Sequence, residues 1–223
     1  MKIGICYTVT TPELTALVEK ELKAQLGDAA EFLVYADESV LSETKKAGCV
    51  PAKAASRLAS LYMSAINDGA DAILNCCSSV GGVADAMQDF ARFVNVPVVR
   101  IDELMCRKAV RLGKRIGIMA TLKSTLEPTK ALLLRCAQEA GAGIETVDCL
   151  VDGAFGLPPA SFTALMAERA KTLAPGVDVI VLAQGSMAFS EQAVAQTAGL
   201  PVLSSPRYGA QAVRLALEAK GLL

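Results

Sequence analysis

The sequence predicts an α/β protein of two pseudo-symmetric domains, each a three-layer sandwich with a parallel sheet between two layers of helices. Short apolar runs suited to buried strands alternate with helical patterns along the 223 residues. The order of these patterns in the second half repeats that of the first half. Ligands bind at the carboxyl ends of strands in such sheets, so we expect a site in the cleft between the two domains.

The first half opens with a strand at 2–9. Thr11, Pro12 and Glu13 then suit the N-cap and first turn of a helix that continues to about Gly27. The other elements expected in this half are a strand at 31–35, a loop or short helical stretch at 37–49, a helix from Pro51 to about Asp68, a strand at 71–77, a helix at about 79–94 and a strand at 96–101.

The second half shows equivalent patterns. Segment 115–118 matches segment 2–5, and the apolar run after Asp178 matches the run after Asp71. The elements expected here are a helix from 124 to about 141, strands at 143–147, 178–184 and 199–202, a helix at 158–173, and a last helix with Ser205 as N-cap and Pro206 at its first position. If the last helix packs back on the first half, the domains are 1–101 with 206–223, and 102–205.

The composition excludes several classes of function. The 22 basic and 23 acidic residues nearly balance and aromatic residues are few, so we expect no nucleic-acid partner. No apolar run is long enough to cross a membrane, and no signal peptide precedes the first strand, so we expect a cytoplasmic location. The 7 cysteines show no disulfide-framework spacing. The absence of histidine removes histidine-dependent hydrolases and His-ligated metal sites, and we expect no metal.

The segment 71–82 combines the features expected of a site. Cys76 and Cys77 end its apolar run, and because neighbouring strand residues point to opposite faces, at most one of these thiols faces the ligand crevice. Ser78 and Ser79 follow at once. A thiol beside hydroxyls and backbone N–H groups has its thiolate form favoured, and a thiolate acts as nucleophile or base without histidine.

Several other residues carry weaker expectations. The glycines at 81 and 82 suit a close approach of a ligand to the backbone. The segment 151–160, rich in Gly and Pro, is a lid or an ordinary connecting loop. Turn roles are expected for Asp71 and Asp178, and a solvated surface position is expected for Arg100, Arg207 and Tyr208.

Three short motifs resemble the Asp/Glu/hydantoin racemase superfamily. Cys77-Ser78-Ser79 is similar to the Cys-Asn-Thr of glutamate racemases, segment 120–125 is similar to the family's Ala-Thr-x-x-Thr, and segment 183–187 is similar to the Gly-Cys-Ala-Gly-Met of hydantoin racemases. The resemblance implies Cys77 as the catalytic residue. The substrate-binding residues that it implies are Tyr7, Thr8, Ser78, Ser79, Thr121, Gln184, Gly185 and Ser186.

The chain departs from this family at Gln184, which stands where the second cysteine is expected. Two-base racemisation needs a proton carrier on each face of the substrate, and glutamine is not one; we expect Gln184 to donate a hydrogen bond to the substrate instead. The resemblance implies a cofactor-independent, isomerase-like or racemase-like enzyme. It would use Cys77 for proton transfer α to a carboxylate on a small amino acid, hydantoin or dicarboxylate.

Two alternatives stay open at this point. The first is a one-cysteine decarboxylase or lyase of the same superfamily. Arylmalonate decarboxylases and maleate isomerases, which belong to this superfamily, are similar in outline to this chain. The second is a non-catalytic protein that binds a small carboxylate. No cofactor is expected, and the oligomeric state is left open, with a homo-oligomer as one option.

Overall fold

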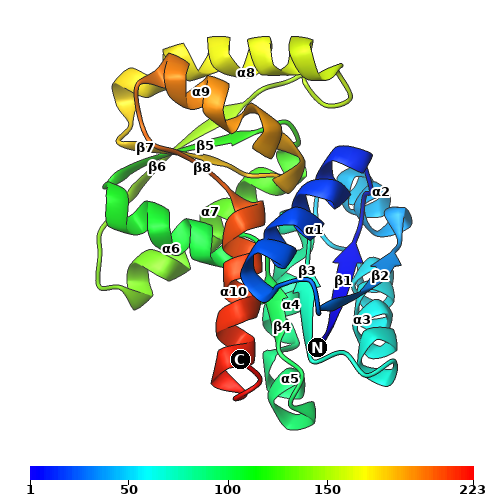
Figure 1. Cartoon of the computed structure of the whole chain (residues 1–223). Coiled ribbons are helices and arrows are strands. Elements are labelled where there is room, and N and C mark those ends of the chain that lie inside the picture. The colour runs from blue at the N-terminus through cyan, green and yellow to red at the C-terminus, as the bar shows by residue number, and fades with distance from the viewer. The chain divides into compact units, whose positions relative to one another are not determined.

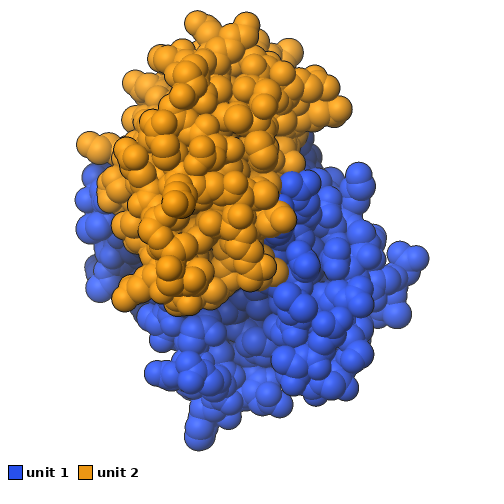
Figure 2. Space-filling view, turned by 90° about the vertical axis from the view of Figure 1, so that its left-hand side faces the viewer, with its two compact units in different colours: residues 1–101, 206–223 blue, residues 102–205 orange.

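The computed structural model describes residues 1–223. The chain forms two compact units, residues 1–101 with 206–223 and residues 102–205, which Figure 2 shows in blue and orange. Each unit holds a parallel sheet of four strands flanked by helices (Figure 1). The predicted α/β fold with two parallel sheets is therefore confirmed. No helix is both long enough and apolar enough to cross a membrane.

The first unit has the strand order β2-β1-β3-β4, with all pairs parallel. Its strands are β1 (Lys2–Tyr7), β2 (Glu31–Ala36), β3 (Ala72–Asn75) and β4 (Val98–Arg100). Its helices are α1 (Pro12–Leu26), α2 (Glu38–Ala47), α3 (Ala52–Asn67), the short 3₁₀ helix η1 (Ser78–Val80), α4 (Gly81–Ala86), α5 (Gln88–Val94) and the C-terminal α10 (Ser205–Ala219).

The strand period of two residues sorts the side chains of this sheet between its two faces. Ile3 and Ile5 of β1 pack in one core cluster with Leu22 of α1 and Val213 of α10. The residues between them face α3, where a Cβ added at Gly4 would lie 2.7 Å from the Cβ of Ala65. The sheet therefore lies between α1 and α10 on one face and α3 on the other.

Two helical segments differ from the prediction. The stretch 37–49, predicted as a loop or short helical stretch, contains the ten-residue helix α2. Asp37 caps it by accepting a hydrogen bond from Ser39 N at 2.9 Å, and Gly48 ends it with φ 71°. The predicted helix 79–94 is broken into η1, α4 and α5, with Met87 between the last two.

The second unit repeats this plan with the strand order β6-β5-β7-β8. Its strands are β5 (Arg115–Ala120), β6 (Glu145–Leu150), β7 (Val179–Leu182) and β8 (Val202–Ser204). Its helices are α6 (Glu103–Leu112), α7 (Lys123–Glu139), α8 (Pro159–Leu173), η2 (Ala174–Gly176), η3 (Gly185–Ser190) and α9 (Glu191–Ala198). Of these, α6 and α9 lie outside the elements predicted from the sequence.

Matching aspartates hold the amino ends of the two sheets. Asp71 Oδ2 accepts a hydrogen bond from Lys2 N at 2.9 Å, just before β3. Asp178 Oδ2 accepts from Lys114 N and Arg115 N, both at 2.8 Å, just before β7. Each carboxylate thus joins the start of one strand to the start of its neighbour, a structural role far from the carboxyl ends of the strands.

The Asp178 anchor is expected to make stability depend on acid pH. The backbone hydrogen bonds from Arg115 and Lys114 hold the pKa of this carboxyl below its ordinary value. A group with a lowered folded-state pKa adds stability above its unfolded pKa, near 3.9, and that stability is lost as pH falls through the lowered value. Asp178→Ala should therefore lower the free energy of unfolding at pH 7 and have less effect at pH 2.5, as measured by urea unfolding. An equal effect at both values would contradict this, and Asp28→Ala, on the surface, is the control.

Candidate active site

Cys77 stands at the carboxyl edge of the first sheet. It follows β3 by two residues, keeps extended dihedrals (φ −136°, ψ 112°) and immediately precedes η1. Its neighbour Cys76 belongs to the apolar cluster of α1, α10 and the strands. The alternation along the strand thus continues past its end, and it puts Cys76 in the core and Cys77 on the α3 side.

Burial makes two other thiols of this unit poor nucleophiles. The pKa of Cys76 lies well above its ordinary value, first because of burial and then because of Cys6 and Cys77 nearby. Burial also raises the pKa of Cys6 to about 12. Since only the thiolate is nucleophilic, both side chains stay protonated and inert at neutral pH.

These values predict a pattern of thiol labelling. Native protein treated with iodoacetamide at pH 8 should be alkylated at the exposed Cys49 and stay unmodified at Cys6 and Cys76. Tandem mass spectrometry of the peptide holding Cys76 and Cys77 separates these two thiols. Modification of Cys76 as fast as Cys49 would contradict its assignment to the core.

A chain of two hydrogen bonds reaches the backbone of Cys77 from α3. Tyr62 Oη donates to Asn75 Oδ1 at 3.0 Å, and Asn75 Nδ2 donates to the carbonyl oxygen of Cys77 at 3.0 Å. Tyr62 and Asn75 are buried. Burial raises the pKa of Tyr62 well above its ordinary value, so its hydroxyl remains a donor.

Two buried hydroxyls beside Cys77 lack hydrogen-bond partners. The sheet register pairs Cys6 with Asn75, and Thr8 and Cys77 each follow these by two residues. The Oγ atoms of Thr8 and Ser78 have no hydrogen-bond partner, although the two residues are 1% and 4% exposed. Because a buried unpaired hydroxyl is unfavourable, such groups indicate a place for a polar ligand.

The predicted site residue Tyr7 occupies a different position. Its side chain packs in the core cluster that contains Cys76, and its hydroxyl makes no hydrogen bond of ordinary geometry. Burial, followed by the nearby Cys76, raises its pKa. The structure therefore places Tyr7 beside the core thiol, on the opposite side of the sheet from Asn75.

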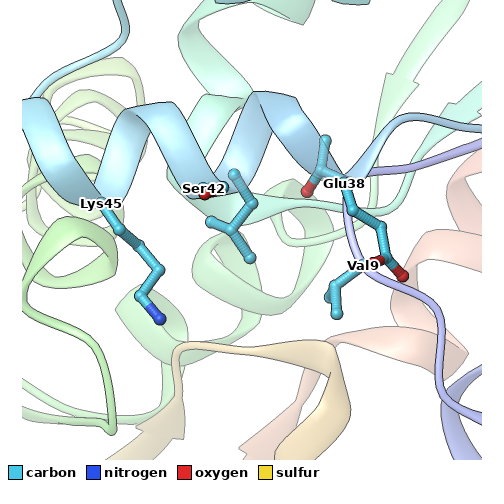
Figure 3. A pocket seen from close by; sticks show the side chains of 6 residues that line it. Val9, Glu38, Ser42 and Lys45 are labelled. Atoms are coloured by element: carbon cyan, nitrogen blue, oxygen red, sulfur yellow. The ribbon is translucent and has the colours of Figure 1, made fainter.

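An open pocket of about 240 Å³ lies next to Thr8, between the end of β1 and α2 (Figure 3). Lys45 and Glu38 stand toward its two ends, with Ser42 between them. Glu38 Oε1 accepts a hydrogen bond from Thr10 Oγ1 at 3.1 Å. The residues that line the pocket are Thr8, Val9, Glu38, Leu41, Ser42 and Lys45.

The expectations for Arg100 and Gly81 are corrected. Arg100 was expected on the solvated surface, but it is 4% exposed and its Nη1 lies 2.6 Å from Asp85 Oδ2. A Cβ at Gly81 would lie 2.3 Å from the Arg100 Cζ atom. The space that this glycine leaves is thus filled by a guanidinium group of the protein, whereas Gly82 has nothing within 4 Å of its added Cβ.

In the second unit, Gln184 takes the place that Cys77 takes in the first. It follows β7 by two residues, is extended (φ −119°, ψ 133°) and immediately precedes η3. Its Oε1 accepts from Thr121 N at 2.7 Å and its Nε2 donates to Thr121 Oγ1 at 2.8 Å. Because a backbone N–H can only donate, the first contact fixes which amide atom is oxygen. The amide is thus held within the unit by Thr121.

The two units differ in the hydrogen bonding of one equivalent threonine hydroxyl. Register pairs Cys6 with Asn75 in one sheet and Met119 with Leu182 in the other, so Thr8 with Cys77 corresponds to Thr121 with Gln184. In the second unit the threonine hydroxyl is satisfied by the amide. In the first unit the same hydroxyl is left without a partner.

The other predicted site residues lie in or at the start of the two 3₁₀ helices η1 and η3. Ser79 is buried within η1, and Gly185 and Ser186 begin η3. Buried hydroxyls without partners also occur at this edge of the second unit, at Ser124 and Ser205. Arg207 lies on the surface as predicted and stacks on Tyr208, with its Cζ atom 4.9 Å from the ring centroid.

The connection 151–160 is anchored at one end. Val151 and Ala154 are fully buried in the core of the second unit, and Val151 N donates to Ala120 O at 2.8 Å. Phe155 and Leu157 are exposed beyond them. These contacts favour an ordinary connecting loop over a lid.

The model of the family described as Asp/Glu/Hydantoin racemase matches residues 3–213. The chain belongs to this family. The resemblance drawn from the short motifs at Cys77, Thr121 and Gln184 is thereby confirmed. No curated protein matches the sequence.

Solved structures show the same fold. The chain is similar to a glutamate racemase from Thermus thermophilus in complex with β-chloro-D-alanine (22% identity, TM-score 0.73, 100% of this chain and 82% of that chain). It is also similar to an allantoin racemase from Klebsiella pneumoniae (19%, TM-score 0.70, 100% and 89%). A double mutant of arylmalonate decarboxylase in its liganded form is a third similar structure (19%, TM-score 0.57, 96% and 92%). At these identities the likeness concerns the fold.

Sequence reasoning missed Asn75, Tyr62 and the burial of Arg100. Asn75 carries a recognisable signal, since it is a polar residue inside an otherwise apolar strand. Such a residue is buried and needs a partner. Its partner Tyr62 lies 13 residues earlier on a helix, and nothing in the sequence pattern links the two.

Proposed function

We propose that this protein is a cofactor-independent enzyme that transfers a proton α to a carboxylate on a small substrate, with Cys77 as the base. The substrate class is a small amino acid, hydantoin or dicarboxylate. One observation carries the proposal: buried hydroxyls of Thr8 and Ser78 lack partners beside Cys77. In the second unit, the hydroxyl of the matching Thr121 is satisfied.

The chemistry follows from these groups. The Cys77 thiolate takes the Cα proton and becomes a thiol, while the electron pair of the C–H bond passes into an enediolate on the carboxylate. Hydroxyl donors and backbone N–H groups stabilise the oxyanion, and such preorganised donors usually supply the largest part of catalysis. The thiol proton exchanges with solvent, and the thiol then returns a solvent-derived proton to the same face of the carbon, so that the α-proton is exchanged and the configuration is kept. Ser78, Ser79 and Thr8 supply donors in the first unit, and Thr121, Gly185 and Ser186 are the proposed donors of the second.

Gln184 would orient a neighbouring hydroxyl in addition to donating a hydrogen bond to the substrate. Its amide oxygen and one amide hydrogen are engaged by Thr121, so it orients the Thr121 hydroxyl, which is left free to donate its own hydrogen. Its second amide hydrogen remains for the substrate. A glutamine neither removes nor delivers a proton, and we therefore propose that proton transfer occurs on one face of the substrate only.

The same observation favours a second candidate, a one-cysteine decarboxylase or lyase. Loss of CO₂ from a malonate leaves the same enediolate, and the Cys77 thiol then protonates the carbon. This reaction needs only one proton carrier, in agreement with a glutamine at 184. The pocket beside Thr8 offers room for the remainder of either substrate.

The test is incubation in deuterated water with amino acids, hydantoins, maleate and substituted malonates, followed by NMR. The proposal expects deuterium at the α-carbon without loss of configuration, or CO₂ release with formation of one enantiomer. Full racemisation would contradict a one-face mechanism. Thermal stabilisation by a carboxylate without any exchange or turnover would instead identify a binding protein.

A further inference from the structure

A buried relay in the first unit ends on the reacting cysteine itself. It consists of Tyr62 and Asn75, which together hold the carbonyl oxygen of Cys77. The two side chains are 0% and 1% exposed. Each hydrogen bond is thus shielded from water, and the orientation of the Cys77 carbonyl is set from inside the protein.

The second unit shows that the fold does not require this relay. Asn75 pairs with Cys6 in the first sheet, and Leu182, the last residue of β7, pairs with the equivalent Met119 in the second sheet. Leu182 is therefore the equivalent of Asn75. Gly4 faces Ala65 on α3, and the equivalent Gly117 faces Leu173 on α8, so Ala65 and Leu173 are equivalent positions. Tyr62 and Ala170 each lie three residues before these positions and are therefore equivalent as well. The apolar pair packs in the core and still supports the same turn into a 3₁₀ helix. The polar pair of Tyr62 and Asn75 occurs in the unit that has a cysteine, Cys77, at the position that Gln184 takes in the other unit.

Holding this carbonyl also sets the next N–H group. The chain has no cis peptide bonds, and in a planar trans peptide the C=O and N–H bonds point in opposite directions. With the Cys77 carbonyl directed to Asn75 in the core, the N–H of Ser78 points away from the core. The Ser78 hydroxyl, buried and without a partner, belongs to the same residue.

We propose that Tyr62 and Asn75 are positioning residues that fix the Cys77–Ser78 peptide, so that its N–H donates to a carboxylate or enediolate oxygen. The inference rests on the proposed function. If the relay is lost, the peptide is free to turn and to bring the partly negative carbonyl oxygen toward the thiolate and the anionic substrate. Both effects oppose ionisation of Cys77 and binding of an anion.

Tyr62→Phe and Asn75→Leu test the relay, the second being the residue that the other unit uses. We measure the rate of Cys77 alkylation by iodoacetamide at pH 8, resolved from Cys76 by tandem mass spectrometry. Each variant should slow alkylation of Cys77 by about twofold to tenfold, the range expected for one hydrogen bond. The double variant should be no slower than Asn75→Leu alone, because Tyr62 acts through Asn75.

Tyr35→Phe is the matched control, since Tyr35 Oη donates to Asp68 Oδ2 at 2.6 Å away from the relay. A purely structural role would loosen the core and speed the labelling of Cys77 and Cys76, whereas the relay predicts slower labelling of Cys77 and no labelling of Cys76. Unchanged or faster alkylation of Cys77 in Tyr62→Phe would overturn the proposal. Because this variant removes a single hydroxyl, it decides the question even if Asn75→Leu does not fold.

Binding of malonate gives a second readout that is independent of turnover. The backbone amide resonance of Ser78 should shift on addition of malonate to the wild-type protein, and it should shift less in both variants at the same malonate concentration. Equal shifts in all three proteins would overturn the relay. If the variants behave as expected while no substrate exchanges its α-proton, the relay stands and the proposed function fails.

Discussion

Replacement of Cys77 by alanine is expected to abolish proton exchange at the α-carbon, with a loss of about 10²- to 10⁴-fold, the usual contribution of a positioned acid or base. Its titratable neighbours on the same strands are poor replacements. The chain lacks histidine, Cys76 is held protonated by burial, and Tyr7 packs with the core. The measurement is deuterium incorporation into the substrate found in the NMR panel.

The adjacent cysteine provides the matched control. Cys76→Ala removes one buried sulfur from the apolar cluster of α1 and α10, so it should lower stability slightly and leave exchange within a fewfold of wild type. Loss of exchange in Cys76→Ala together with its retention in Cys77→Ala would reverse the assignment of the two thiols. Circular dichroism on both variants separates loss of folding from loss of chemistry.

The adjacent glycines at 81 and 82 are expected to respond in opposite ways to alanine. Gly81→Ala places a Cβ 2.3 Å from the Arg100 Cζ atom, and that guanidinium is buried and bound to Asp85 at 2.6 Å. The side chain has to move and its ion pair is disturbed, so we expect a loss of about 1–3 kcal/mol in the free energy of unfolding. Urea unfolding measures this loss.

Gly82→Ala is the internal control for this prediction. Nothing lies within 4 Å of an added Cβ at Gly82, and the residue is helical, so alanine should be neutral or stabilise by up to about 1 kcal/mol. Equal effects at the two positions would contradict the role given to Arg100. They would mean that the buried guanidinium moves at little expense, and that Gly81 is not needed for its packing.

Most of the fold was predictable because the strands are short apolar runs between helical patterns. The predicted strands at 2–9, 31–35 and 115–118 all exist, with ends that differ by a few residues. The difference at 37–49, one of several among the helices, has a physical cause. Helix α2 buries few residues and carries many charges, so its apolar pattern is weak, and capping by Asp37 together with packing on α3 stabilises it.

The candidate site was predictable in its positions but not in its hydrogen bonds. The repeated spacing from Asp71 to Cys77 and from Asp178 to Gln184 predicted equivalent residues, and both precede a 3₁₀ helix with extended dihedrals. That Gln184 is held by Thr121 could not be predicted, because this contact joins residues 63 positions apart. The roles of these residues toward a substrate stay predictions that the experiments above address.

The sequence by itself determined the alternation of strands and helices, the internal repeat, the absence of histidine and the presence of a glutamine at 184, where the matching position of the first half is Cys77. These features depend on local periodicity and residue identity. Only the tertiary structure decided which polar groups are satisfied: the Thr121 hydroxyl is bonded and that of Thr8 is not, and Arg100 is buried against Gly81. Hydrogen bonds and burial depend on residues brought together from distant parts of the chain. For this reason the character of the Cys77 site, with its relay from Tyr62 through Asn75, emerges only when the strands are assembled into a sheet.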